Sequence, residues 1–290
     1  MRFFEKALEM RKRIYGSNSA HPDIMGCVNN LGAVWDRLGD PRKAISFYEQ
    51  ALRMQKRMLG ENTAHPHIAK TLVNLGTAWS YLGDNRKAVT LLDQALKIQQ
   101  IVYGENAAHP DIVGSLSSLG ACWTVFGDHR KAIDFYERGL RLSRLIYGMN
   151  AAHPHIAEIL NNIGKAWGFL GEHEKAIDIY EQALKMSRTI HGQTGAHPDM
   201  AVLLTNLGNA WGDLGDHRKS IQLHEEALDI SRRVYGSNAA HGLIANILSA
   251  LGNAWSKTGD HRKGNAFHEE AMGISKVIDE HNVPRTKNTP

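Results

Sequence analysis

Apolar and polar residues follow two periods along this chain, a short helical one set inside a longer one of 44 residues. In residues 20–38, apolar side chains recur every three or four positions, the spacing of an amphipathic helix. Gly39 and Asp40 then form a short turn, and a second apolar stripe follows in residues 41–59. Because two residues leave room only for a reversal of direction, the pattern predicts an antiparallel helical hairpin.

This hairpin pattern recurs six times. The six tryptophans lie on the 44-residue period, and we expect them in the core: Trp35, Trp79, Trp123, Trp167, Trp211 and Trp255. Six histidines keep the same spacing, and we interpret them as helix starts: His21, His65, His109, His153, His197 and His241. A fixed period of this length indicates one supersecondary unit that is copied and stacked.

A glycine column lies inside the predicted first helix of each hairpin: Gly32, Gly76, Gly120, Gly164, Gly208 and Gly252. Glycine in a helix interior costs about 1 kcal/mol relative to alanine. Six such costs indicate a packing reason. We predict that the second helix, led by Ala44 and its equivalents, approaches closely at this point.

These columns resemble the tetratricopeptide repeat signature, through Leu31-Gly32-x-x-Trp35 followed by Ala44-x-x-x-Tyr48 and Ala51. The resemblance covers residues 21–279. The 44-residue length and the His-Pro-Asp opening resemble the kinesin light chain and nephrocystin-3 subgroup, and the run that begins at Asn206 resembles the Pins/LGN-type adaptors. The resemblance implies an all-α fold, a right-handed superhelical solenoid of antiparallel helix pairs.

The repeat also suggests an organisation of the chain. Residues 1–16 match the second helix of a preceding repeat, so we expect the chain to start in the middle of a repeat, as a fragment of a longer array would. Residues 17–279 form six hairpins in one solenoid domain, and residues 280–290 form a polar C-terminal tail.

The composition narrows the function classes. The chain has 34 Lys and Arg against 30 Asp and Glu, a formal charge of +4. This positive excess is smaller than is typical of proteins that bind nucleic acids. The two cysteines fall in different repeats, which is typical of a reducing compartment, and no apolar run is long enough for a membrane span. We therefore expect a cytoplasmic protein. Phosphate-loop, zinc-protease and nucleophile-elbow motifs are missing from the sequence, so we expect no enzyme activity, cofactor or metal.

Function is expected where the repeats differ. The resemblance implies that the first helices line a concave groove for a peptide of a partner protein. One variable column early in these helices reads Gly26, Lys70, Gly114, Glu158, Val202 and Asn246. The candidate peptide-binding residues are Asn30, Arg37, Lys70, Asn74, Tyr81, Asn162, Lys165, Phe169, Asn206, Asn209 and Asn253. The asparagines have an alternative role, in which their side chains bond neighbouring helix ends.

Two other functions stay open. The array could be a structural or sensor arm, or it could form a homo-oligomer through Phe3, Phe4, Leu8 and Tyr15, which lack a partner helix of their own. A basic stripe of Arg-Lys pairs at the hairpin turns, such as Arg42-Lys43, could bind an acidic partner or, less favourably, a nucleic acid.

Overall fold

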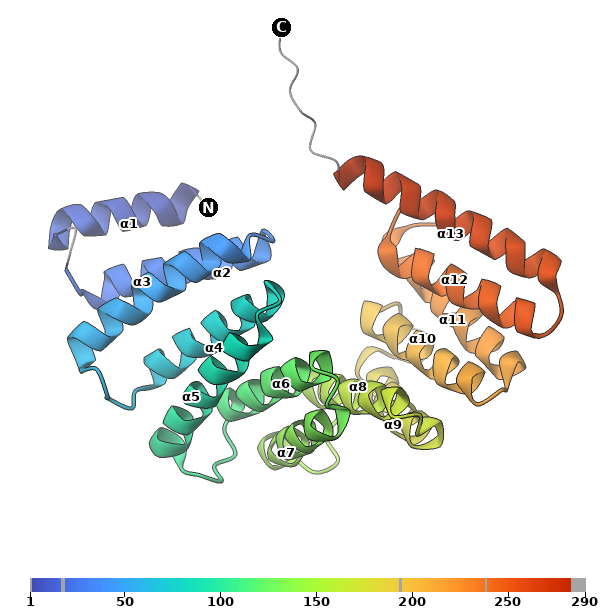
Figure 1. Ribbon diagram of the computed structural model, residues 1–290, viewed down its shortest axis with the longest axis horizontal. Coiled ribbons are helices and arrows are strands. Elements are labelled where there is room, and N and C mark those ends of the chain that lie inside the picture. Colours follow the sequence, from blue (N-terminus) through green and yellow to red (C-terminus); the bar gives the residue numbers. More distant parts are fainter. Residues whose placement is uncertain (1, 17–18, 193–194, 238, 283–290) are drawn as a thin grey trace, which may run out of the picture. The chain divides into compact units, whose positions relative to one another are not determined.

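The computed structural model describes residues 2–282 except 17–18, 193–194 and 238, and every regular element in that part is a helix (Figure 1). The helices are α1 (Arg2–Tyr15), α2 (Pro22–Arg37), α3 (Pro41–Leu59), α4 (Pro66–Tyr81), α5 (Asn85–Tyr103), α6 (Pro110–Val125), α7 (His129–Tyr147), α8 (Pro154–Phe169), α9 (His173–His191), α10 (Pro198–Asp213), α11 (His217–Tyr235), α12 (Gly242–Lys257) and α13 (His261–Asn282). Helix α13 continues past residue 279, where the polar tail was expected to begin, and residues 283–290 lie outside the described part.

The first helix of each hairpin starts at the predicted histidine. In all six, the imidazole Nδ1 accepts a hydrogen bond from the backbone N–H two residues later, at 3.2–3.3 Å. The histidine is therefore the N-cap residue, in a place where Ser, Thr, Asp or Asn is more common. The second helices start at an acidic residue, and Asp40 illustrates the geometry by accepting the Lys43 N–H at 3.1 Å.

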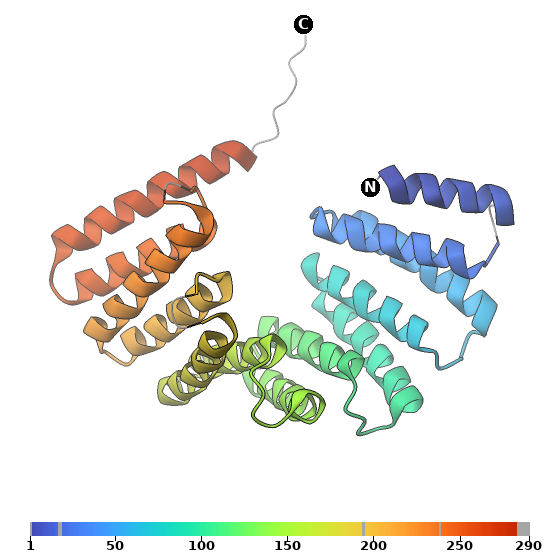
Figure 2. The ribbon, with the colours of Figure 1, turned by 180° about the vertical axis from the view of Figure 1, so that it is seen from behind.

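The chain divides into two compact units, residues 1–149 (unit 1) and 150–290 (unit 2). In unit 1, each helix packs against the next one, and α2, α4 and α6 also contact one another in succession. Unit 2 repeats this arrangement with α8, α10 and α12. Within the described part of either unit, the backbones of the second helices do not approach one another in this way, and those of unit 2 meet through long side chains. We call α2, α4, α6 and α8, α10, α12 the first-helix rows; Figure 2 shows the helices from behind.

The glycine column marks a close approach, as predicted, although the contacting group differs from the one expected. A Cβ on Gly32 would lie 2.5 Å from the ring of Tyr48, and a Cβ on Gly164 would lie 2.8 Å from that of Tyr180. The side chain that lies on the glycine therefore belongs to the residue four positions after Ala44 or its equivalent in the second helix. The six partners are Tyr48, Leu92, Tyr136, Tyr180, His224 and His268.

The tryptophan column lies at the edge of the core rather than inside it, as Trp35 and Trp79 show by packing against a buried cluster. All six indoles are half-buried rather than fully buried. Each lies under the ammonium group of a lysine from the following helix, 3.4–4.5 Å from the ring centroid. The lysines are Lys43, Lys87, Lys131, Lys175, Lys219 and Lys263. A cation over an indole face is favourable, so each tryptophan joins the core to the surface at a hairpin turn.

Candidate interaction surface

All of the predicted peptide-binding residues lie on the first-helix rows. Arg37 and Asn30 belong to α2, and Lys70, Asn74 and Tyr81 belong to α4. In unit 2 they are Asn162, Lys165 and Phe169 of α8, Asn206 and Asn209 of α10, and Asn253 of α12. Three of the asparagines are half-buried (Asn74, Asn162 and Asn206), and the other members of the set are exposed. The aromatic side chains stand out, since Tyr81 is 76% and Phe169 58% exposed.

The structure brings some of these residues together. Tyr81 and Arg37 line one hollow of about 460 Å³ near the turn between α2 and α3. Lys165 lies one helical turn from Phe169, with its ammonium 5.8 Å from the ring centroid. Asn206 instead donates from Nδ2 to Oδ1 of Asn161 at 2.8 Å, which ties α10 to α8. That bond gives Asn206 a structural contact between repeats.

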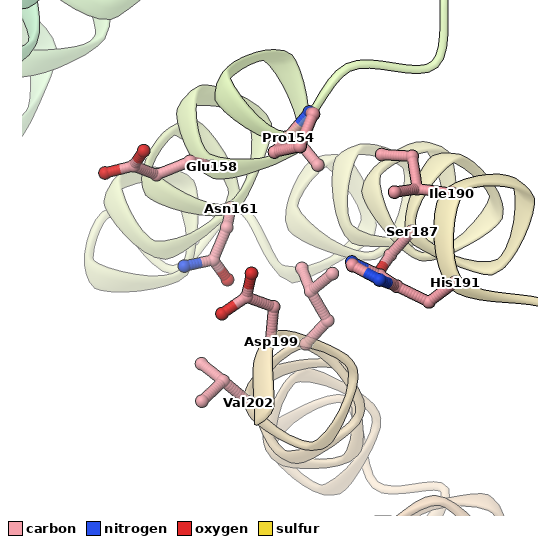
Figure 3. Close-up of a pocket in the computed structure, with 10 residues that line it drawn as sticks. Pro154, Glu158, Asn161, Ser187, Ile190, His191, Asp199 and Val202 are labelled. Atoms are coloured by element: carbon pink, nitrogen blue, oxygen red, sulfur yellow. The ribbon is translucent and has the colours of Figure 1, made fainter. Parts of the chain in front are cut away.

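Two further hollows occupy equivalent places in the two units. Each lies between consecutive first helices and the end of the second helix that joins them. The unit 1 hollow, of about 340 Å³, is lined by Pro22, Met25, Gly26, Asn29, Gln55, Met58, Leu59, His65, His67, Lys70 and Thr71. The unit 2 hollow, of about 260 Å³, is lined by Pro154, Ala157, Glu158, Asn161, Ser187, Ile190, His191, Asp199, Val202 and Leu203 (Figure 3). Every residue of the second set lies 132 positions, or three 44-residue repeats, after a residue of the first.

The unit 2 hollow combines acidic and apolar groups. Figure 3 shows the Asn161 amide and the Asp199 carboxylate turned toward one another, with Glu158 at the rim. At its base, Ser187 is 2% exposed, and its Oγ has no hydrogen-bond partner. Burial and the neighbouring His197 lower the pKa of His191, while Asp199 opposes the shift, so His191 is neutral at pH 7.

His191 also belongs to a group that could hold a metal ion. Its donor atom and those of His197 and Asp199 lie within 4.8 Å of one another. However, His197 Nδ1 already accepts the Asp199 backbone N–H at 3.3 Å, as the cap of α10. A neutral imidazole has one acceptor nitrogen, so a metal bound through His197 would displace this cap. We therefore assign the group to the helix start.

The unit 1 hollow has the opposite charge. Lys70 lines it beside the imidazoles of His65 and His67, and none of the described residues that line it is acidic. Its base is closed by a buried hydrogen bond from Gln55 Nε2 to Thr71 Oγ1 at 3.0 Å. The two hollows share a backbone arrangement and differ in the groups that they present.

Comparison with known proteins identifies the architecture. Family models described as tetratricopeptide repeat match residues 24–67, 67–144, 111–189 and 199–276. The chain belongs to the tetratricopeptide repeat family. No curated protein shows significant similarity to this tetratricopeptide repeat chain.

Several solved structures share the tetratricopeptide repeat fold. BtubC (BKLC) from P. vanneervenii has 22% identity and a TM-score of 0.68, over 86% of this chain and 97% of that one. A putative kinesin light chain of Podosopora anserina has 21% identity and a TM-score of 0.60, over 74% and 98%. A Rap protein complexed with competence and sporulation factor has 14% identity and a TM-score of 0.59, over 91% and 78%.

Most of the residues that line the two hollows were not predicted from the sequence. Of the predicted set, only Lys70 lines one of them. The variable column did contain the signal, because Gly26 and Lys70 line the first hollow and Glu158 and Val202 line the second. Asp199 sits in the His-Pro-Asp opening, and we had interpreted that opening only as a helix start.

None of the described helices has an apolar stretch long enough to cross a bilayer.

Proposed function

We propose that this chain is a protein-interaction scaffold rather than an enzyme, and that it holds a peptide segment of a partner protein against the first-helix rows. Tetratricopeptide repeats generally mediate protein–protein interactions. The Rap protein that shares the fold was solved with a bound factor. We place the scaffold in the cytoplasm, because Cys27 and Cys122 are both unpaired.

One observation carries this proposal. The residues that repeat are used in packing, as helix caps, glycine contacts and covered indoles. The residues that vary between repeats lie on the first-helix rows, where they are exposed or line hollows. Exposed aromatics such as Tyr81 and Phe169 are the side chains that dominate protein interfaces.

A displayed random-peptide library selected on the wild-type chain tests the proposal. The selected peptides are titrated by fluorescence anisotropy against Lys165→Ala/Phe169→Ala and against a control, Asp178→Ala/Gln182→Ala, on exposed positions of α9. We expect the first variant to weaken Kd by about tenfold or more with an unchanged melting temperature, and the control to bind like the wild type. An equal loss of affinity in both variants contradicts the proposal, and so does a loss of affinity accompanied by a lower melting temperature.

Self-association is the second candidate, favoured by the exposed apolar face of α1. Phe3 is 89% and Ile14 69% exposed. Leu8, which we expected to lack a partner, is instead buried against α2 in a cluster with Ile24 and Val28. Light scattering over a range of concentrations decides: a dimer lost in Phe3→Lys/Ile14→Lys supports this role, and a monomer at all concentrations rejects it.

The structure gives a nucleic-acid partner little support. In each Arg-Lys pair of the basic stripe, the lysine lies over a tryptophan ring, as Lys131 does over Trp123 at 3.4 Å. Several of these lysines also pair with the acidic cap of their helix, as Lys43 does with Asp40 at 3.1 Å. The arginines of the stripe remain exposed.

A further inference from the structure

The two equivalent hollows differ at the positions that set their charge. Residue 26 is glycine in unit 1, whereas its equivalent in unit 2 is Glu158. Residue 67 is histidine, whereas its equivalent is Asp199. Lys70 corresponds to the uncharged Val202. Three exchanges that all change the charge in one direction turn one basic hollow into one acidic hollow on the same backbone.

We infer that the two hollows select partner side chains of opposite charge: the unit 2 hollow takes a lysine or arginine of the bound segment, and the unit 1 hollow takes a glutamate or aspartate. This inference rests on the proposed peptide-binding function, and it names the chemistry that each unit recognises.

The unit 2 hollow suits a basic side chain along its whole length. Ala157, Ile190 and Leu203 offer apolar walls to the aliphatic stem. The carboxylates of Glu158 and Asp199 are exposed and can accept charge-assisted hydrogen bonds from the cationic end. Neutral His191 adds no competing positive charge.

A buried polar atom at the base is available to the same ligand. Ser187 Oγ has no hydrogen-bond partner, although such groups are usually paired. An N–H group at the end of a lysine or arginine side chain could donate to it. An acidic side chain would instead meet two carboxylates in the same small space.

The unit 1 hollow suits a carboxylate. Lys70 supplies the positive charge, and His65 and His67, whose rings lie 5.1 Å apart, offer further nitrogen atoms. Met25, Met58 and Leu59 give it apolar walls comparable to those of unit 2. Its buried Gln55 donates from Nε2 to Thr71, and its unpaired Oε1 is an acceptor that a carboxylate cannot bond, so the recognition of an acid falls to the groups at the opening.

Two fluorescein-labelled probe peptides test the inference, with the same leucine and glycine frame and either lysine or glutamate at the variable places. They are titrated against the full chain at physiological salt. Asp199→His and Lys70→Val each install the residue found at the equivalent position of the other hollow. Asp178→His and Lys97→Val make the same charge changes at exposed positions of α9 and α5 outside the hollows.

We expect Asp199→His to raise the Kd of the lysine peptide by about tenfold and to leave the Kd of the glutamate peptide unchanged. Lys70→Val should raise the Kd of the glutamate peptide and leave that of the lysine peptide unchanged. The controls should bind both peptides like the wild type. If peptides bind but the hollow variants match their controls, the charge selection is wrong while the scaffold function stands. If neither probe nor any library peptide binds the wild type, both proposals fall.

Discussion

At the residue scale, the repeated glycines are explained by the side chain that covers each of them. Tyr48 lies on Gly32 and also donates its hydroxyl to Oδ2 of Asp36 at 2.7 Å. Burial raises the pKa of the Tyr48 hydroxyl, and the Asp36 bond raises it further. The glycine is needed because a methyl group would occupy the space of the ring.

Helix α6 offers a matched pair of glycines for testing this. A Cβ on Gly120 would lie 2.6 Å from Cε1 of Tyr136, whereas a Cβ on Gly114 meets nothing within 4 Å. We expect Gly120→Ala to destabilise the chain by about 1–3 kcal/mol through overpacking. Gly114→Ala should stabilise it by about 0.5–1 kcal/mol through helix propensity. Urea unfolding followed by circular dichroism measures both, and equal stabilities would contradict the role given to Tyr136.

In the fifth repeat the covering ring is an imidazole, and this predicts a pH dependence. His224 is 1% exposed, and burial lowers its pKa from 6.5 to about 4. The unfolded chain therefore binds a proton more readily between these values. The stability of the folded chain that depends on a neutral His224 is complete above pH 6.5 and is lost as the pH falls toward 4. From pH 7 to pH 5 the free energy of unfolding should drop by about 2 kcal/mol on this account.

His224→Tyr should flatten that dependence, because tyrosine does not titrate in this range and Tyr180 already occupies the equivalent place over Gly164. Urea midpoints at pH 7 and pH 5 provide the comparison. The control His261→Gln removes an exposed histidine and should keep the wild-type slope. A slope in His224→Tyr as steep as that of the wild type would rule out His224 as its source.

At the element scale, the first helices are started by an uncommon histidine cap, and at His21, His109, His197 and His241 a ring from the preceding helix stacks on it. The imidazole of His109 lies 3.6 Å from the ring of Tyr103, nearly parallel to it, and its Nδ1 accepts the Asp111 N–H. Tyr103 Oη also donates to Oδ2 of Asp111 at 2.9 Å. Two of these contacts, the ring stack and the Tyr103 hydrogen bond, join the end of one second helix to the start of the next first helix.

Substitutions of His109 separate the cap from the stack. His109→Ala removes both, and we expect it to cost about 1–2 kcal/mol. His109→Asn keeps an acceptor that N-caps favour and loses only the ring contact, so its cost should be clearly smaller. Urea unfolding gives the order of stabilities. If asparagine is no better than alanine, the hydrogen bond is not what the histidine contributes.

The elements could be predicted from the sequence because their ends are set locally. Proline and the acidic cap residues mark where helices start. Positive-φ glycines such as Gly39 and Gly83 lie in the turns directly after the first helices and mark where those helices end. The position of Trp123 could not be predicted this way, since its cover, Lys131, comes from the next helix. The unit 2 hollow was missed for the same reason: it forms only when three helices pack together.

At the scale of the whole molecule, the two units differ in how their second helices are joined. In unit 2, Arg188 pairs with Glu226 and Arg232 pairs with Glu270, both at 2.7 Å, from one second helix to the next. The equivalent places in unit 1 hold Lys56 with Gln94 and Gln100 with Arg138, which cannot form ion pairs. The salt dependence that such pairs confer should therefore arise in unit 2.

Replacing Glu226 by glutamine gives unit 2 the residue that unit 1 carries at position 94, and it should lower the free energy of unfolding only modestly. The side chains of Arg188 and Glu226 are 31% and 41% exposed, so solvent screens the pair and the loss should be about 0.5–1 kcal/mol at low salt. In about 1 M NaCl the Debye length is only about 3 Å, and the difference from the wild type should nearly vanish. Glu225→Gln is the matched control, because it removes the same charge from an exposed neighbouring position. Urea unfolding of the three proteins at both salt concentrations decides, and a salt-independent loss in Glu226→Gln would mean that packing, not charge, joins α9 to α11.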